Sequence, residues 1–124
     1  MGDMKHIAVI EENEEQREML ERLLKCLGYE ATGYDSPSSF HCVKERCDSE
    51  RGCFDAIMTD YRSRWHQDGV EFVRQLERKK CKIPKLAVIS ASWDNEGLEK
   101  SRALKCKLLS KPFSVKELEE WLNG

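Results

Sequence analysis

The sequence predicts an α/β domain with a doubly wound, five-stranded parallel sheet of order 2-1-3-4-5, covered by helices on both faces in three α/β/α layers. The chain has 124 residues, the length of one domain, so residues 1–124 are treated as a single unit. Short apolar runs alternate with segments of helical periodicity, which gives five strand-helix units. Right-handed crossovers leave few other arrangements for such units, and a closed barrel would need eight of them.

The first strand and helix have the clearest patterns. Residues 6–10, HIAVI, are a run of apolar and β-branched side chains, typical of a strand that is covered on both faces. From residue 14 the spacing becomes helical, and Gly28 is expected to end this helix in a left-handed conformation. The apolar stripe of the helix consists of Met19, Leu20, Leu23, Leu24 and Leu27.

The next unit is less strongly patterned. Residues 29–34 predict a weaker second strand, and Ser36-Pro37 predicts the start of a short helix that runs to about residue 47. Residues 54–60, FDAIMTD, form a third apolar run, which ends on the carboxylate of Asp60.

The second half of the chain repeats the alternation. Val70, Val73 and Leu76 recur at helical spacing, and Pro84 precedes a fourth strand at residues 85–90, KLAVIS. An amphipathic segment at residues 95–104 leads to the fifth strand, which is the last one.

The fifth strand is short and is followed by a clear helix start. Residues 107–110, KLLS, form the strand. Ser114 and Glu117 are spaced as a capping box, which predicts the start of the last helix. The apolar residues of that helix are Val115, Leu118, Trp121 and Leu122.

The composition argues against several functional classes. With 21 basic and 23 acidic side chains the net charge is -2, so we expect no nucleic-acid binding by this domain. No apolar run is long enough to span a bilayer, and the N-terminus does not resemble a signal peptide, so we expect a cytoplasmic protein without membrane insertion. Because the N-terminus does not resemble a signal peptide, we interpret the six cysteines as mostly reduced thiols. Their spacings match no paired metal-binding framework, which argues against a metal site.

Polar residues end four of the predicted strands or follow them directly. They are Glu11 and Glu12 after the first strand, Asp60 at the end of the third, Ser90 at the end of the fourth and Lys111 after the fifth. In a doubly wound sheet the functional site lies at this carboxyl edge. Crowded carboxylates repel one another unless they share a cation, and hard oxygen ligands suit Mg²⁺ or Mn²⁺. A lysine and a hydroxyl beside them could hold a phosphoryl group while a carboxylate acts as nucleophile.

Over nearly its whole length the sequence resembles the receiver domains of two-component response regulators. The motifs that carry the resemblance are the acidic pair in IAVIEEN, the strand FDAIMTD, Asp68-Gly69, Ser90-Ala91 in VISAS, and SKPF at residues 110–113. The resemblance implies a flavodoxin-like fold and Mg²⁺-dependent phosphorylation by a sensor histidine kinase or a histidine phosphotransfer protein. Phosphorylation would switch a surface that binds a downstream target, which the sequence does not identify. By this resemblance we expect a signalling switch and not an enzyme.

The resemblance also assigns roles to single residues. Asp60 would be the phosphoacceptor, Glu12 a direct metal ligand and Glu11 a ligand acting through water, while Ser90 and Lys111 would contact the phosphoryl group. Arg62 belongs to the metal site by the same resemblance. Arg62 and Ser92 match positions that tune the lifetime of the acyl phosphate. Pro112 matches a proline that often follows a cis bond and aims the lysine inward.

The sequence departs from the family pattern at the acidic pair and at Leu108. Both members of the acidic pair are glutamates, whose longer side chains could weaken Mg²⁺ binding, because this ion requires tight octahedral geometry. Leu108 stands where an aromatic residue often precedes the KP motif, so the usual aromatic rotamer switch is missing. Two alternatives therefore stay open: a pseudo-receiver that acts as a constitutive protein-interaction module, and, less favoured, a small phosphatase-like enzyme.

Overall fold

The computed structural model describes the chain at residues 5–36, 54–61, 69–78, 85–90, 98–99 and 106–123. All five predicted strands lie in this part of the chain: β1 (His6–Ile10), β2 (Glu30–Tyr34), β3 (Ala56–Asp60), β4 (Lys85–Ser90) and β5 (Lys107–Ser110). Its longer helices are α1 (Glu14–Cys26), α3 (Gly69–Arg78) and α5 (Val115–Asn123). The predicted bounds of β1, β4 and β5 are confirmed, whereas β2 and β3 begin later than predicted, at residues 30 and 56.

The five strands form one parallel sheet in the predicted order β2-β1-β3-β4-β5. The register aligns the carboxyl ends of the central strands, with Ile10 opposite Thr59 and Asp60 opposite Ile89. In the neighbouring pair of strands, β4 and β5, Ser90 lies opposite Ser110. The residues that follow these strands are therefore brought to one edge of the sheet, as the sequence predicts.

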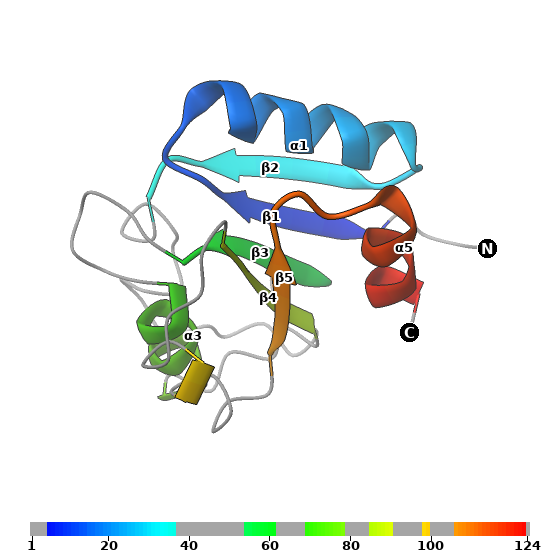
Figure 1. The fold of residues 1–124 in the computed structure, drawn as a ribbon. Helices are drawn as coiled ribbons and strands as arrows, with labels where there is room; N and C mark the ends of the chain where they lie inside the picture. The colour runs from blue at the N-terminus through cyan, green and yellow to red at the C-terminus, as the bar shows by residue number, and fades with distance from the viewer. Residues whose placement is uncertain are drawn as a thin grey trace.

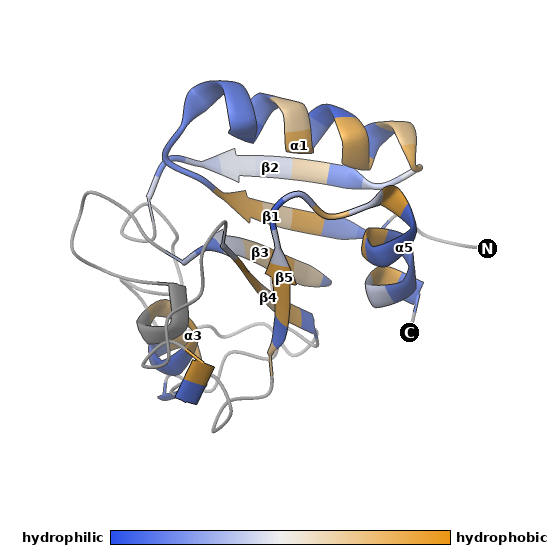
Figure 2. Ribbon diagram, viewed as in Figure 1, coloured by the Kyte–Doolittle hydropathy of each residue, from blue (hydrophilic) through white to orange (hydrophobic). Residues whose placement is uncertain are grey.

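Helices cover both faces of the sheet, as Figure 1 shows, with α1 and α5 on one face and α3 on the other. Because successive strand residues point to opposite faces, the apolar residues divide into two cores. The core beneath α1 and α5 includes Ile7, Val9, Met58, Leu24, Leu118 and Leu122. The core beneath α3 includes Ala8, Ile10, Ile57, Phe72 and Leu76. Figure 2 shows the corresponding apolar colouring over most of β1, which is covered on both faces.

Two residues define the ends of helix α1, which lies against β1 and β2. Asn13 is the N-cap, and its side-chain oxygen accepts a hydrogen bond from the Gln16 N–H at 3.0 Å. Gly28 follows the helix with a φ of 94°, so its predicted left-handed conformation is confirmed. The prediction that Met19 lies on the apolar stripe is wrong, because this residue is 63% exposed. It lies about 100° around the helix from Leu20, at the margin of the face that reaches the sheet.

Helix α5 follows Lys111 closely, so its start helps to fix the segment that carries this lysine. The Lys111–Pro112 peptide bond is cis. The Glu117 N–H donates to the Ser114 hydroxyl oxygen at 3.1 Å, so the predicted capping role of Ser114 is confirmed.

Removing this cap gives a first prediction. Ser114→Ala should lower the free energy of unfolding by about 1 kcal/mol, because a helix N–H then loses its acceptor. Ser114→Asp keeps an acceptor and should stay near the wild type. Urea denaturation of the three proteins checks this expectation, and equal losses in both variants would contradict it.

Some predicted features lie outside the described residues. These are the helix that starts at Ser36-Pro37, most of the amphipathic segment at residues 95–104, the loop at residues 62–68, and Cys42, Cys47, Cys53 and Cys81. Cys26 and Cys106 are described, and both are free thiols, as expected. Among the described helices, none combines the length and the apolar character that crossing a membrane requires.

Candidate functional site

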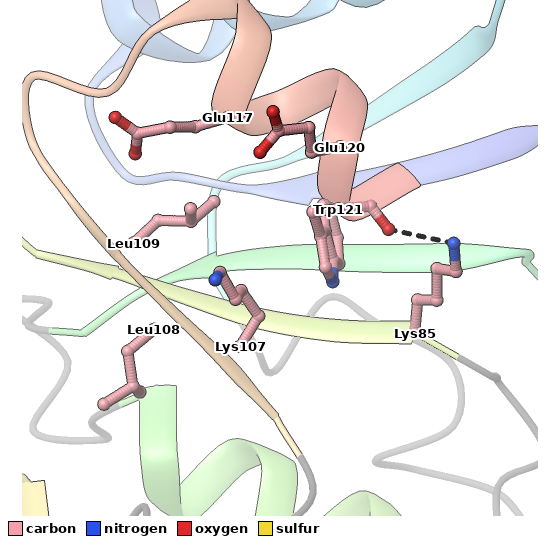
Figure 3. Close-up of a pocket in the computed structure, with 7 residues that line it drawn as sticks. All are labelled: Lys85, Lys107, Leu108, Leu109, Glu117, Glu120 and Trp121. Atoms are coloured by element: carbon pink, nitrogen blue, oxygen red, sulfur yellow. Dashed lines mark hydrogen bonds between the residues drawn. The ribbon is translucent and has the colours of Figure 1, made fainter. Parts of the chain in front are cut away.

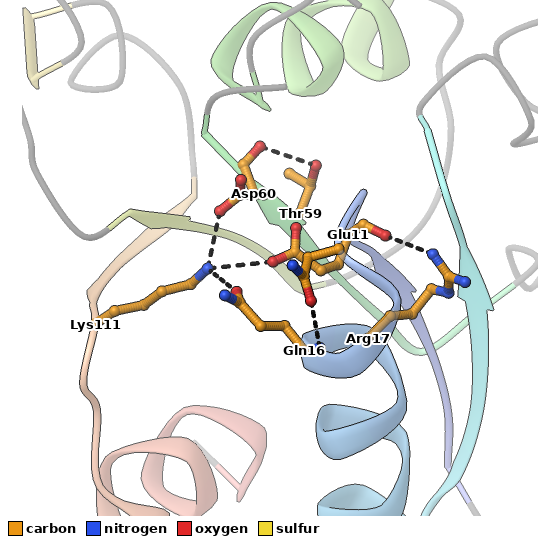
Figure 4. Close-up of polar contacts among 7 residues, drawn as sticks. Glu11, Gln16, Arg17, Thr59, Asp60 and Lys111 are labelled. Carbon is orange, nitrogen blue, oxygen red and sulfur yellow. Dashed lines mark hydrogen bonds and ion pairs between the residues drawn. The ribbon is translucent and has the colours of Figure 1, made fainter. Parts of the chain in front are cut away.

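The side chain of Lys111 joins the residues that end two strands of the sheet. Its Nζ lies 3.3 Å from Glu11 Oε1, which follows β1, and 3.2 Å from Asp60 Oδ1 at the end of β3. Figure 4 shows the lysine reaching across from the end of β5 to both carboxylates. The structure thus brings together Glu11, Asp60 and Lys111, three of the site residues that the sequence predicts.

Glu11 is a buried carboxylate, with only 5% of the residue exposed. Burial raises the pKa of Glu11 above its ordinary value, and the charge of Asp60 raises it further. The charge of Lys111 and its hydrogen bond act in the opposite direction and lower this pKa. Burial therefore disfavours the ionised form of Glu11, and the ammonium of Lys111 favours it.

Asp60 is half-buried, and its pKa is also raised. Burial raises its pKa, the ammonium of Lys111 and its hydrogen bond lower it, and the charge of Glu12 raises it. Two carboxyl groups with raised pKa values therefore lie on either side of one lysine. Such a cluster at the carboxyl edge of a parallel sheet is typical of a functional site.

Glu12 is more exposed than Glu11 and influences Asp60 through its charge. Within the described residues, no three Asp, Glu, His or Cys side chains already converge as a metal-binding cluster. The donor chemistry of Glu11, Glu12 and Asp60 nevertheless fits a hard divalent cation, because all three offer carboxylate oxygens. Burial is the main cause that raises the pKa of both Glu11 and Asp60, and a cation bound nearby would favour their charged forms.

Ser90 lies at the end of β4 and is connected to Lys111 through the backbone. Its carbonyl oxygen accepts a hydrogen bond from the Lys111 N–H at 2.9 Å, and the residue is 6% exposed. Strand pairing places Ser90 one residue beyond the partner of Asp60, which is Ile89. A small cavity lies at this point and is lined by Ile10, Glu11, Leu20, Met58, Asp60, Ile89 and Lys111.

Two residues in the first turns of α1 also belong to the site, and the sequence did not reveal them. The Oε1 atom of Gln16 lies 2.8 Å from Lys111 Nζ, closer than either carboxylate, and the guanidinium of Arg17 donates to the Glu11 carbonyl oxygen at 3.0 Å. Gly33 on β2 makes room for two side chains of α1, since a Cβ there would overlap Glu21 Oε1 and come within 2.9 Å of the Arg17 side chain. The only signal in the sequence was their closeness to the acidic pair.

Leu108 does not take part in the polar site. It is half-buried against Tyr61, Val73 and Val88, on the face of the sheet that α3 covers. The aliphatic side chain therefore fills an apolar position.

A second hollow, of about 430 Å³, lies between β5 and α5 at the opposite end of the strands (Figure 3). Lys85 borders it and donates to the carbonyl oxygens of Trp121 at 2.9 Å and Leu122 at 2.6 Å. Burial and the charge of Lys5 lower the pKa of Lys85. This lysine satisfies carbonyl groups at the end of α5, which is a structural role.

Three predicted residues, Arg62, Asp68 and Ser92, lie outside the described part of the chain. Their roles stay predictions.

No protein-family model matches the sequence, and no curated protein matches it. Solved structures do match. A response regulator receiver protein from Pseudomonas putida superposes with a TM-score of 0.82 at 22% identity, over 99% of this chain and 98% of that one. The chemotaxis protein CheY4 of Vibrio cholerae gives 0.76 at 20% identity, over 98% of both chains.

A third solved structure is the receiver domain of a sensor histidine kinase from Pseudomonas aeruginosa, crystallised with a magnesium ion coordinated in its active site cleft. It superposes with a TM-score of 0.75 at 22% identity, over 98% of this chain and 100% of that one. Together with the sheet order and the placement of the helices, these superpositions show that the chain has the fold of response regulator receiver domains.

Proposed function

We propose that this chain is a phosphoacceptor receiver domain, in which Asp60 takes a phosphoryl group from the phosphohistidine of a sensor histidine kinase or a histidine phosphotransfer protein. The observation that supports this most directly is the contact of Lys111 with both Glu11 and Asp60 at the carboxyl edge of the sheet. Phosphorylation then changes a surface that binds a downstream protein. The domain acts as a switch and not as an enzyme with a substrate of its own.

The positions of the side chains support the following transfer step. A carboxylate oxygen of Asp60 forms the new P–O bond while the P–N bond of the donor breaks, and the electron pair of that bond leaves with the imidazole nitrogen. Negative charge is spread over the phosphoryl oxygens in the transition state. Lys111 is 3.2 Å from Asp60 and can donate to one of these oxygens, and the Ser90 hydroxyl on the neighbouring strand can donate to another.

Glu11, Glu12 and Asp60 would hold Mg²⁺ or Mn²⁺, with Arg62 as the further metal-site residue that the sequence resemblance assigns. When bound, the ion supplies positive charge that reduces repulsion between the carboxylates and the phosphoryl oxygens. The magnesium ion in the cleft of the Pseudomonas aeruginosa receiver domain supports this assignment.

Metal affinity should depend more on Glu12 than on Glu11, because Lys111 already contacts the Glu11 carboxylate. We expect Glu12→Gln to weaken Mg²⁺ binding on the order of tenfold and Glu11→Gln to weaken it less. Isothermal titration with Mg²⁺ measures both, and Glu15→Gln on the exposed face of α1 is the control for lost negative charge. Equal losses for Glu11 and Glu12 would contradict the assignment of Glu12 as the direct ligand.

A pseudo-receiver is the second candidate function. The observation that favours it is the double glutamate, with Glu11 already engaged by Lys111. The deciding experiment is incubation with a small phosphodonor and Mg²⁺, followed by intact mass measurement. A phosphoacceptor gains the mass of one labile phosphoryl group, whereas a folded protein that gains none acts as a constitutive interaction module.

A further inference from the structure

The contact between Gln16 and Lys111 links two distant parts of the chain at the phosphoacceptor. Lys111 Nζ has three acceptors within hydrogen-bond distance: Gln16 Oε1 at 2.8 Å, Asp60 Oδ1 at 3.2 Å and Glu11 Oε1 at 3.3 Å. An ammonium group has three N–H donors and no acceptor, so the oxygen of the Gln16 amide must face it. These contacts can therefore use all three donors of the lysine, and the shortest contact is to the neutral amide.

The main chain of Gln16 is itself held in place. Its N–H donates to Asn13 Oδ1 at 3.0 Å, and the next N–H, that of Arg17, donates to the Asn13 carbonyl oxygen at 2.9 Å. Asn13 directly follows the acidic pair, so the start of α1 is joined to the segment that carries Glu11 and Glu12. Figure 4 shows the Gln16 side chain extending from this turn toward Lys111. The amide is thus presented to the lysine from a capped helix start.

The amide differs from the other two acceptors in its charge. Phosphorylation of Asp60 replaces a carboxylate with an acyl phosphate, and a divalent ion would compete with Lys111 for the oxygens of Glu11. Both ionic contacts of the lysine therefore change during the proposed reaction. The Gln16 oxygen carries no net charge and can keep its hydrogen bond throughout.

We propose that Gln16 is a positioning residue for Lys111, holding the ammonium beside Asp60 while the carboxylate contacts of the lysine change. The inference rests on the proposed function, and it adds the start of α1 to the machinery of the site. Gln16 acts through the lysine and need not touch the phosphoryl group. With Gln16 in place, one donor of Lys111 stays on the amide, and another is free to turn to the phosphoryl oxygen.

Gln16→Met tests this inference, since methionine has a similar length and helix propensity but no amide oxygen. Gln16→Glu restores an acceptor oxygen at the same position. Glu15→Met makes the same kind of change one residue earlier, on the same exposed turn. All three variants are compared with the wild type in the full chain.

The first measurement is the side-chain ¹⁵N NMR signal of the Lys111 ammonium, assigned by its loss in Lys111→Met. Gln16→Met should shift this signal and speed its proton exchange with water, whereas Gln16→Glu and Glu15→Met should leave the ammonium hydrogen-bonded. The second measurement is the rate of Asp60 phosphorylation by a small phosphodonor with Mg²⁺. Gln16→Met should slow it about fivefold, the size expected for one lost hydrogen bond.

An unchanged ammonium signal in Gln16→Met would overturn the inference, because the lysine would then be held without the amide. An altered signal with an unchanged phosphorylation rate would overturn the positioning role. The wild type serves to test the proposed function separately from the inference. If the wild type gains no phosphoryl group while its ammonium still responds to Gln16→Met, the hydrogen bond is supported and the phosphoacceptor function is rejected.

Discussion

Asp60→Asn is expected to abolish the phosphoryl adduct completely. The asparagine keeps the size of the side chain but replaces the carboxylate nucleophile with an amide, which does not form an acyl phosphate under these conditions. Among the described residues, Asp60 is the carboxylate at the end of the central strand β3, 3.2 Å from Lys111. Intact mass measurement after incubation with a small phosphodonor and Mg²⁺ gives the result directly.

Asp35→Asn is the matched control, because Asp35 is an exposed aspartate just after β2. It should gain the phosphoryl group as the wild type does. The assignment of Asp60 as acceptor is wrong if Asp60→Asn gains the same labile mass at the wild-type rate.

The raised pKa of Asp60 also gives Asp60→Asn an effect on stability. A carboxyl group whose pKa is raised in the folded state binds more protons there than in the unfolded chain. Its stabilising contribution is fully present below the ordinary pKa of about 3.8 and is lost as the pH rises through the folded pKa. Asp60→Asn should therefore be more stable than the wild type at neutral pH, and this advantage should shrink in acid.

The strands of the sheet and their order could be predicted from the sequence. Runs such as HIAVI and KLAVIS are shorter than typical helices and contain β-branched residues. The first is followed by two glutamates and the second is preceded by a proline, which limits their extent. Crossover handedness then leaves little freedom in strand order. Periodicity does not predict the exposure of Met19, because it gives the direction of an apolar stripe but not its width, which depends on how far α1 lies from the sheet.

The site was predictable only in part. Glu11, Asp60, Ser90 and Lys111 directly follow or end strands, so topology alone brings them to one edge. Gln16 could not be found in this way, because its role depends on the direction in which α1 leaves the edge and on the reach of Lys111 from the end of β5. A glutamine in a first helical turn is ordinary in composition, and only the three-dimensional contact distinguishes it.

Lys111→Met should slow phosphorylation of Asp60 on the order of a hundredfold and should shift its pH dependence. The rate falls because the phosphoryl oxygens lose a charged donor in the transition state. The pH shift has a separate cause. Lys111 lowers the pKa of both Asp60 and Glu11, so its removal raises both values, and the nucleophilic carboxylate of Asp60 forms only at higher pH. The onset of phosphorylation should therefore move toward alkaline pH.

Rates measured between pH 4 and 9, a range chosen to span the ordinary values of the carboxyl groups, test both parts of this prediction. Lys116→Met removes a lysine from the exposed face of α5 and should leave rate and onset unchanged. A lower rate with the wild-type onset would mean that Lys111 acts only on the phosphoryl group. A shifted onset with the wild-type rate at high pH would mean that the lysine serves to keep Asp60 ionised and contributes nothing further to the transfer. Because Lys111 contacts Asp60 directly and can also donate to a phosphoryl group bound there, we expect both effects together.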